Sequence, residues 1–431
     1  MNLRTLICGA GVVFAAFLMR AVGAPGPSSS APSYTVRDLG TLPGGTFSQT
    51  YVIGDNELIG GAAAVSDGSQ HAILWHKGQK LDIGAPGLGG PNSGVFGVNE
   101  FFLAEGVAET SHKDPNQENF CAYGTGFTCL PFVWQAGRTF ALPSLGGPNA
   151  SVGNMNRWGA ISGYAETDQV DSSCLTAVSV GGTGPQVLDY QGVIWGPAPG
   201  AIRRLKPLPG DTVSVALWVN DLGQAVGVSG TCANTVLPPI AFGPHAVLWE
   251  RDGSVHDLGN LGGTVDVTIP GIGNAALAIN NLSEVVGGSA LPGNTLHHGF
   301  LWTRKSGIKD LGTLPDDATS VGTGINDHGT IAGVSLDGSG NPRAVIWYKG
   351  GIHDLNDLAQ DSPLFLLWSS AINGSDEIAG FGVDPNTGDV HAFLAKPDGN
   401  DCDDAPGRKP KALLADWICR RVREQIRFLS R

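Results

Sequence analysis

The chain has 431 residues, of which 64 are glycine and 27 are proline, and only 15% are charged. Abundant Gly and Pro beside Val, Ile, Leu and Thr favour short strands joined by tight turns over a helical protein. The formal net charge of −13 argues against nucleic-acid binding, because phosphate contacts need a basic surface.

The first 33 residues have the pattern of an export signal followed by a linker. Arg4 precedes an apolar run from Leu6 to Met19, and Val22-Gly23-Ala24 supplies the small residues of a cleavage site. The apolar run is too short to span a membrane comfortably. We therefore predict a signal peptide at residues 1–24, a flexible linker at residues 25–33, and secretion to an extracellular or periplasmic compartment.

Residues 34–397 repeat one pattern about seven times. The clearest copy, residues 299–333, holds four short apolar runs separated by turns rich in Gly and Asn. One run ends in Leu-Trp, the next carries Asp-Leu-Gly, and the last two flank an Asn turn. Seven copies of a four-stranded unit predict an all-β, seven-bladed β-propeller. We expect the repeated tryptophans to be packed between blades; they include Trp75, Trp249, Trp302 and Trp347.

The two ends of the repeat region are offset by one strand. The region begins with the second strand of the unit, at Asp38-Leu39-Gly40, and stops after a first strand, His391–Leu394. A ring whose last blade takes strands from both termini needs this offset, so we predict that the two segments pair. If the strand before the Asn turn is innermost, both connections of variable length lie on the opposite face. Variable loops on a rigid scaffold usually carry binding sites.

Three long inserts occur in consecutive units, at Ala108–Leu130, Ala165–Gln191 and Ser229–Pro244. An even number of cysteines in an exported chain favours disulfides over free buried thiols. We expect one disulfide inside the first insert, Cys121–Cys129, and one between neighbouring inserts, Cys174–Cys232. The disulfide candidates are Cys121, Cys129, Cys174, Cys232, Cys402 and Cys419.

The repeat pattern stops after Pro397 and is followed by a basic tail. Residues 398–410 form a polar linker, and residues 411–431 have the apolar periodicity of one amphipathic helix. Residues 34–397 carry a net charge of −17, whereas residues 405–431 carry +6. The C-terminal helix therefore either contacts a membrane surface, binds a partner or docks on the propeller itself. We expect the protein to be a monomer.

Three motifs in register resemble those of the HAF-repeat family, described as probable extracellular repeats. They are the His-Ala-Phe-Leu-Trp-like strand, the Asp-Leu-Gly strand and the Ile-Asn-x-x-Gly-x-Ile-x-Gly hairpin. His391-Ala392-Phe393 is the triplet that gives the family its name, and His71-Ala72 is a variant. The resemblance covers residues 34–397, although the second and third units depart from it. It implies export and a repeat fold, and it implies no defined activity or catalytic residues.

No stretch of the chain has a recognisable catalytic, metal-binding or cofactor-binding pattern. The repeated histidines occupy equivalent positions in different blades, so a ring would hold them too far apart to share one ion. Asp384–Asp389 has oxygen ligands at alternating positions but lacks the distal Glu of a calcium loop, which favours an ordinary turn. We predict no catalytic, cofactor or metal residues, and a structural role for the repeated histidines: His71, His245, His298 and His391.

Two functions fit these patterns. The first is a non-enzymatic secreted protein that binds a glycan or protein ligand on the variable-loop face, through inserts that carry both aromatic and polar side chains. The binding-face candidates are Asp114, Tyr123, Phe127 and Tyr190. The alternative is a hydrolase or lyase acting on a polysaccharide, with paired carboxylates at the propeller mouth. Its candidate residues are Asp114, Glu118, Asp168, Asp171 and Asp189.

Overall fold

The computed structural model describes residues 31–398, except for 85–86, 175–185, 199, 237–240 and 267–271. Five sequence predictions lie wholly or largely outside the described residues: the signal peptide, the linker at 25–33 apart from its last three residues, the linker at 398–410 apart from its first residue, the C-terminal helix, and any disulfide of Cys402 or Cys419. Among the described residues, no helix is long and apolar enough to cross a membrane.

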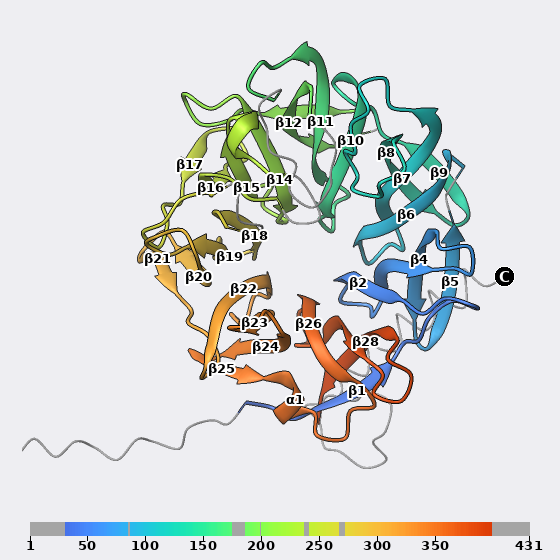
Figure 1. Ribbon diagram of the computed structural model, residues 1–431, viewed down its shortest axis with the longest axis vertical. Coiled ribbons are helices and arrows are strands. Elements are labelled where there is room, and N and C mark those ends of the chain that lie inside the picture. Colours follow the sequence, from blue (N-terminus) through green and yellow to red (C-terminus); the bar gives the residue numbers. More distant parts are fainter. Residues whose placement is uncertain are drawn as a thin grey trace, which may run out of the picture. The chain divides into compact units, whose positions relative to one another are not determined.

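Seven antiparallel four-stranded sheets form the blades of a β-propeller, with one strand of each nearest the axis (Figure 1). The predicted all-β, seven-bladed fold is confirmed. Strands are given from the inner strand outward. The first blade is β2 (Ser48–Ile53), β3 (Ile59–Ala64), β4 (Gln70–His76), β5 (Gln79–Gly84); the second is β6 (Gly89–Val98), β7 (Ala104–Lys113), β8 (Phe127–Gln135), β9 (Arg138–Ala141); the third is β10 (Gly146–Met155), β11 (Ile161–Val170), β12 (Leu188–Trp195), β13 (Ile202–Leu205); and the fourth is β14 (Val213–Val219), β15 (Ala225–Gly230), β16 (His245–Trp249), β17 (Val255–Asp257). The fifth blade is β18 (Ala275–Ile279), β19 (Val285–Ala290), β20 (His297–Thr303), β21 (Gly307–Asp310); the sixth is β22 (Asp317–Ile325), β23 (Ile331–Asp337), β24 (Pro342–Tyr348), β25 (Gly351–Asp354); and the seventh is β26 (Phe365–Ile372), β27 (Ile378–Val383), β28 (Val390–Pro397), β1 (Tyr34–Asp38). One short α-helix, α1 (Leu355–Leu358), follows β25.

The seventh blade joins the two ends of the repeat region. Its outer strand is β1, which pairs antiparallel with β28 in the register Arg37↔Leu394 and Asp38↔Phe393. The predicted closure by N- and C-terminal strands is therefore confirmed. Without β1, the backbone groups of β28 would face solvent along an unpaired edge.

The repeated asparagines tie the blades together around the axis. In each Asn turn, the side-chain oxygen accepts the N–H groups of the residues two and four positions later, as Asn220 does from Leu222 and Gln224. The side-chain Nδ2 then donates to a backbone carbonyl of the next blade. These links run from Asn99 to Arg157 (3.5 Å), Asn156 to Asn220 (2.9 Å), Asn220 to Asn280 (3.0 Å), Asn280 to Asn326 (3.0 Å), Asn326 to Asn373 (3.0 Å) and Asn373 to Gly54 (3.2 Å).

The repeated histidine pairs with the aspartate of the Asp-Leu-Gly strand in its own blade. His391 Nδ1 lies 2.9 Å from Asp38 Oδ2, and the same Asp accepts the N–H of Gly40 at 2.6 Å. Three other blades repeat the contact, between His71 and Asp82, His245 and Asp257, and His298 and Asp310. The two motifs thus form one hydrogen-bonded contact at the outer edge of a blade. This contact gives the repeated His a structural role.

The hydrophobic core lies between adjacent blades. Trp75, Trp249 and Trp347 are buried, as predicted, and Trp302 is half-buried against the same kind of cluster. The indole N–H of Trp249 donates to Lys206 O of the preceding blade at 2.7 Å. Each of these rings therefore fills the gap between two sheets, where an aromatic side chain contributes most to packing.

Candidate functional site on the insert face

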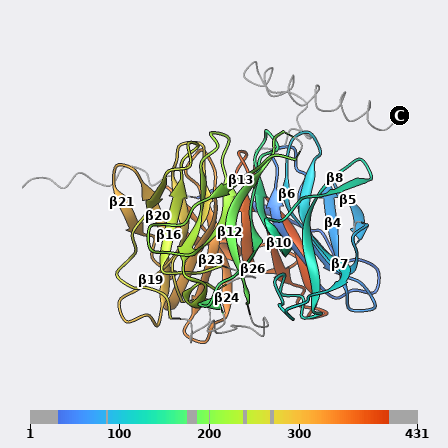
Figure 2. The same ribbon diagram turned by 90° about the horizontal axis from the view of Figure 1, so that it is seen from above.

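The strands run between two faces of the ring (Figure 2). The inner-turn face carries the Asn turns, and the insert face carries the connections between the second and third strands, including all three long inserts. The inner strand ends at an Asn turn in six blades and at the equivalent turn of Gly54 in the first, so the opposite end of the second strand must lie on the insert face. The predicted gathering of the variable connections on one face follows from this topology.

Two disulfides hold the inserts, and both pairings match the prediction. Cys121 bonds Cys129 within the insert of the second blade, with a Cα–Cα distance of 6.4 Å. Cys174 bonds Cys232 between the third and fourth blades, at 4.6 Å. A pair of structural disulfides indicates an oxidising compartment.

A buried hydrogen-bond network joins the first two inserts. Glu118 accepts the backbone N–H groups of Val187 at 2.6 Å and Leu188 at 3.1 Å, so an acidic side chain of the second blade holds the chain of the third. Asp114 accepts the side-chain amide of Asn149 at 2.7 Å, again across two blades. Combined with the disulfides, this network links the three inserts to one another.

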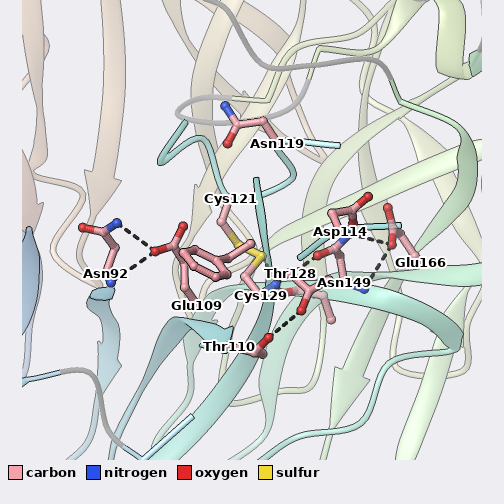
Figure 3. The surroundings of a disulfide bond; sticks show 12 residues. Asn92, Glu109, Thr110, Asp114, Asn119, Cys121, Thr128, Cys129, Asn149 and Glu166 are labelled. Atoms are coloured by element: carbon pink, nitrogen blue, oxygen red, sulfur yellow. Dashed lines mark hydrogen bonds between the residues drawn. A yellow bond between two sulfur atoms is a disulfide. The ribbon is translucent and has the colours of Figure 1, made fainter. Parts of the chain in front are cut away.

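The carboxyl of Glu166 completes the network. It accepts the backbone N–H of Asn149 at 3.0 Å and its side-chain amide at 2.9 Å (Figure 3). Burial, and then the neighbouring charge of Glu118, raise the pKa of Glu166 to about 9. Burial also raises the pKa of Glu118. At neutral pH the pair therefore retains a proton, as two buried neighbouring carboxyls must.

The same arrangement occurs one blade earlier. Glu109 accepts the backbone N–H of Asn92 at 3.2 Å and its side-chain amide at 2.8 Å, on the other side of the Cys121–Cys129 disulfide (Figure 3). Two repeated motifs mark these Asn–Glu pairs in the sequence, and our sequence predictions did not include them. Gly-Gly-Pro-Asn stands at 89–92 and 146–149, and Ala-Glu-Thr at 108–110 and 165–167.

Two of the four binding-face candidates do not reach the surface. Tyr190 is fully buried and packs with Phe120 and Tyr164, at ring distances of 6.3 Å to each. Asp114 is also buried, with its oxygens engaged by Asn149 and by backbone N–H groups. Asp114 of the first insert and Tyr190 of the second are therefore interior residues, which a long loop needs in order to hold one conformation.

The other two candidates, Tyr123 and Phe127, are half-buried at the surface of the first insert. Lys113 Nζ lies 3.6 Å from the centre of the Phe127 ring, a cation–π contact. Burial raises the pKa of Tyr123 well above its usual value, and the nearby phenol of Tyr51 raises it further. The first insert therefore lies near the inner strand of the neighbouring first blade.

An aromatic pair on two inner strands extends this surface. Tyr51 of β2 and Phe96 of β6 stack with ring centroids 4.2 Å apart and planes 10° apart, and both rings are half-buried. We name Tyr51, Phe96, Tyr123 and Phe127 the aromatic surface. Our sequence prediction missed the first two, because they lie on repeat strands and not in the inserts.

The carboxylates proposed for a hydrolase differ in their surroundings. Glu118 is buried and fully engaged, and Asp168 is exposed. Asp189 is half-buried, and one of its oxygens, Oδ1, is buried without a hydrogen-bond partner. Burial, and then the charge of Asp171, raise the pKa of Asp189 to about 6. The residues that the structure describes contain no group of three or more His, Cys, Asp or Glu side chains able to hold a metal.

No family model matches the chain, and no curated protein matches its sequence. Several solved structures resemble it. The β-propeller domain of the Trilobed protease from Pyrococcus furiosus is 10% identical with a TM-score of 0.48, over 86% of this chain and 100% of that one. Pyrococcus horikoshii acylaminoacyl peptidase is 11% identical with a TM-score of 0.49, over 86% of this chain and 54% of that one. An Aleuria aurantia lectin in complex with Fucα1-6GlcNAc is 8% identical, with a TM-score of 0.31, over 84% and 99%. Similarities this weak assign no function, and the resemblance to HAF repeats stays a prediction.

Proposed function

We propose that the protein is a secreted, non-enzymatic binding protein whose ligand, a glycan, contacts the aromatic surface on the insert face. The observation that carries the proposal is the junction of the first insert with the inner strands. There the disulfide-held Tyr123 lies near the stacked pair of Tyr51 and Phe96. Sugar rings present apolar C–H faces and polar edges, which suit aromatic rings set among a few hydrogen-bonding groups.

Polar groups beside the aromatic surface complete this proposal. The hydroxyl of Thr125 donates to Glu109, and Gln49 donates to the hydroxyl of Tyr51. These contacts fix the side chains before any ligand arrives, and a pre-organised site loses less entropy on binding. The disulfide supports the same role, because it restricts the loop that carries Tyr123.

The test is a glycan-array screen of the mature protein, followed by affinity measurements on single variants. Tyr51→Ser and Tyr123→Ser should each weaken binding by at least about tenfold, equivalent to about 1.4 kcal/mol, since each removes one stacking ring. Phe140→Ser is the matched control, because Phe140 is an exposed ring on the outer strand β9, away from the inserts. Equal binding by the Tyr variants and the wild-type protein would move the site elsewhere.

A second candidate, polysaccharide hydrolysis, rests on the pair Asp171 and Asp189. The pKa of Asp189 is raised to about 6, whereas the pKa of Asp171 is lowered. Burial acts to raise the pKa of Asp171, but hydrogen bonds from Thr212 and Ser173 outweigh it. Neighbouring carboxyls with separated pKa values can serve as acid and base. Release of reducing ends that Asp189→Asn abolishes, without loss of glycan binding, would favour this candidate over pure binding.

A further inference from the structure

Four large apolar side chains stand exposed at the same position of four successive blades. They are Phe101, Trp158, Leu222 and Leu282, with exposed fractions of 64, 60, 50 and 64%. Each follows the Asn of its turn by two residues. In the other three blades this position holds a polar residue or a histidine, so the apolar side chains form one arc over the second to fifth blades.

The hydrogen-bond ring joins the turns that carry these side chains. Each Asn turn touches the next through its side-chain amide, and Arg157 also forms ion pairs with Glu100 at 3.1 Å and Asp221 at 3.4 Å on either side. Many polar atoms of the turns are therefore used within the ring. The apolar arc is left exposed on the inner-turn face, and several large exposed apolar side chains on one face favour a docking site.

The charge around the arc is strongly acidic. The seven turns, residues 54–58, 99–103, 156–160, 220–224, 280–284, 326–330 and 373–377, contain eight acidic residues and one basic residue, Arg157. An occupant of this face should therefore be both apolar and basic. Residues 411–431 fit this description, because they contain six basic and two acidic residues. Their apolar residues recur at helical spacing along one side.

The described chain ends on the same face. β28 runs toward the inner turns, and Lys396 near its end pairs with Glu57 at 2.6 Å and Glu377 at 3.2 Å, both in those turns. The third strand lies about 10 Å outside the inner strand, and seven sheets packed about 10 Å apart enclose a circle about 22 Å across. Residues 399–410 can span about 40 Å when extended, which is enough to reach the arc from the seventh blade.

We propose that residues 411–431 of this chain form a helix that docks on the apolar arc of its own propeller. A helix of this length is about 30 Å long and can lie along several turns. Its apolar side, which includes Trp417, Ile418 and Val422, covers Trp158 and Leu222, and its arginines face the acidic turns. The tail then stabilises the face opposite the inserts and shields it from other partners.

The test places a photo-crosslinking benzoylphenylalanine at position 222 of the full mature chain. Irradiation should join this position to a peptide within residues 411–431 of the same molecule, identified by mass spectrometry in the monomer band. The same group at Leu81, which is exposed on the outer strand β5, is the control and should give no such product. Crosslinks only between copies, or none to residues 411–431, would overturn the proposal.

Hydrogen exchange gives an independent measurement on the full chain. In the double variant Trp158→Ser and Leu222→Ser, amides of residues 411–431 should exchange at least about tenfold faster than in the wild type, because an undocked helix frays. Phe140→Ser should leave that rate unchanged.

The lipid alternative is tested with vesicles containing phosphatidylserine. Binding of the wild-type chain that disappears in the double variant would assign the arc to a membrane surface and overturn the proposal.

Discussion

Glu105 offers a direct test of how the blades pack. It lies on β7 opposite Gly97, and both of its carboxyl oxygens are buried without a hydrogen-bond partner. A Cβ built on Gly97 would overlap the Glu105 side chain, so the carboxyl lies against the inner strand itself. The equivalent residues of the fourth and fifth blades are Val226 and Val286. Glu105→Val should therefore give the second blade the apolar residue that the fourth and fifth blades have.

The expected gain depends on pH. Burial raises the pKa of Glu105 well above its usual value, so the folded protein keeps this carboxyl protonated. Even then its unmet hydrogen bonds cost about 1–3 kcal/mol, which Glu105→Val should recover at pH 4.5. Above the pKa of the unfolded chain, about 4.3, the unfolded state loses the proton and the folded state does not. The wild-type stability then falls by about 1.4 kcal/mol per pH unit until the folded carboxyl titrates.

Thermal unfolding followed by tryptophan fluorescence at pH 4.5 and 7.5 measures both effects. An unfolding entropy of about 2.1 cal/mol/K per residue makes 1 kcal/mol worth about 1 °C in a propeller of this size. The melting temperature of Glu105→Val should exceed that of the wild type at both values, and by more at pH 7.5. Glu105→Gln should remove only the pH-dependent part. Glu109→Val, which breaks the bonds with Asn92, should destabilise instead. A gain that is equal at both pH values would refute the assignment of an unpaired, protonated Glu105.

Three further changes test the rest of the fold. Trp249→Ala should lower the free energy of unfolding by about 3–5 kcal/mol in chemical denaturation, whereas Leu81→Ala, at an exposed site on the outer strand β5, should change it little. Cys232→Ser opens a loop closed over a sequence separation of 58, which should cost about 4 kcal/mol; a melting temperature unchanged by both the variant and a reductant would contradict this. Gly54→Asn should add the missing amide link toward Asn99 and raise stability by about 1 kcal/mol; a lower melting temperature would mean that the Asn56 side chain, 2.9 Å from the new Cβ, cannot move aside.

The repeated features of the fold could be predicted because each has a local physical cause that recurs. The Asn turn, the buried Trp and the one-strand offset of the termini appear in register, and together they predict blade number, strand order and closure. Pairing of Cys174 with Cys232 followed from the same register, because loops of neighbouring blades are close. What the repeat could not predict is the partner of a residue that occurs in only two blades. The Asn–Glu pairs at Asn92 and Asn149 belong to this class.

The aromatic surface was only half predicted for a different reason. Tyr123 and Phe127 were found because they lie in an insert, and inserts were assumed to be exposed. The same assumption failed for Tyr190, which is buried with Phe120. Tyr51 was missed because it lies in a repeat strand and is not one of the residues that the blades share. Exposure depends on the direction of a side chain within the strand, and insert boundaries do not report that direction.

The length of a connection explains why the inner turns expose large apolar side chains. A long insert must bury apolar residues of its own to hold one conformation, so Phe120 of the first insert and Tyr190 of the second turn inward, and a disulfide closes part of the first insert as well. A five-residue turn that is fixed by the bonds of one Asn needs no core. Its apolar residue, such as Trp158 or Leu282, is therefore free to face outward. Constant turns can thus form a docking surface of a propeller, and its contacts need not be confined to the variable loops.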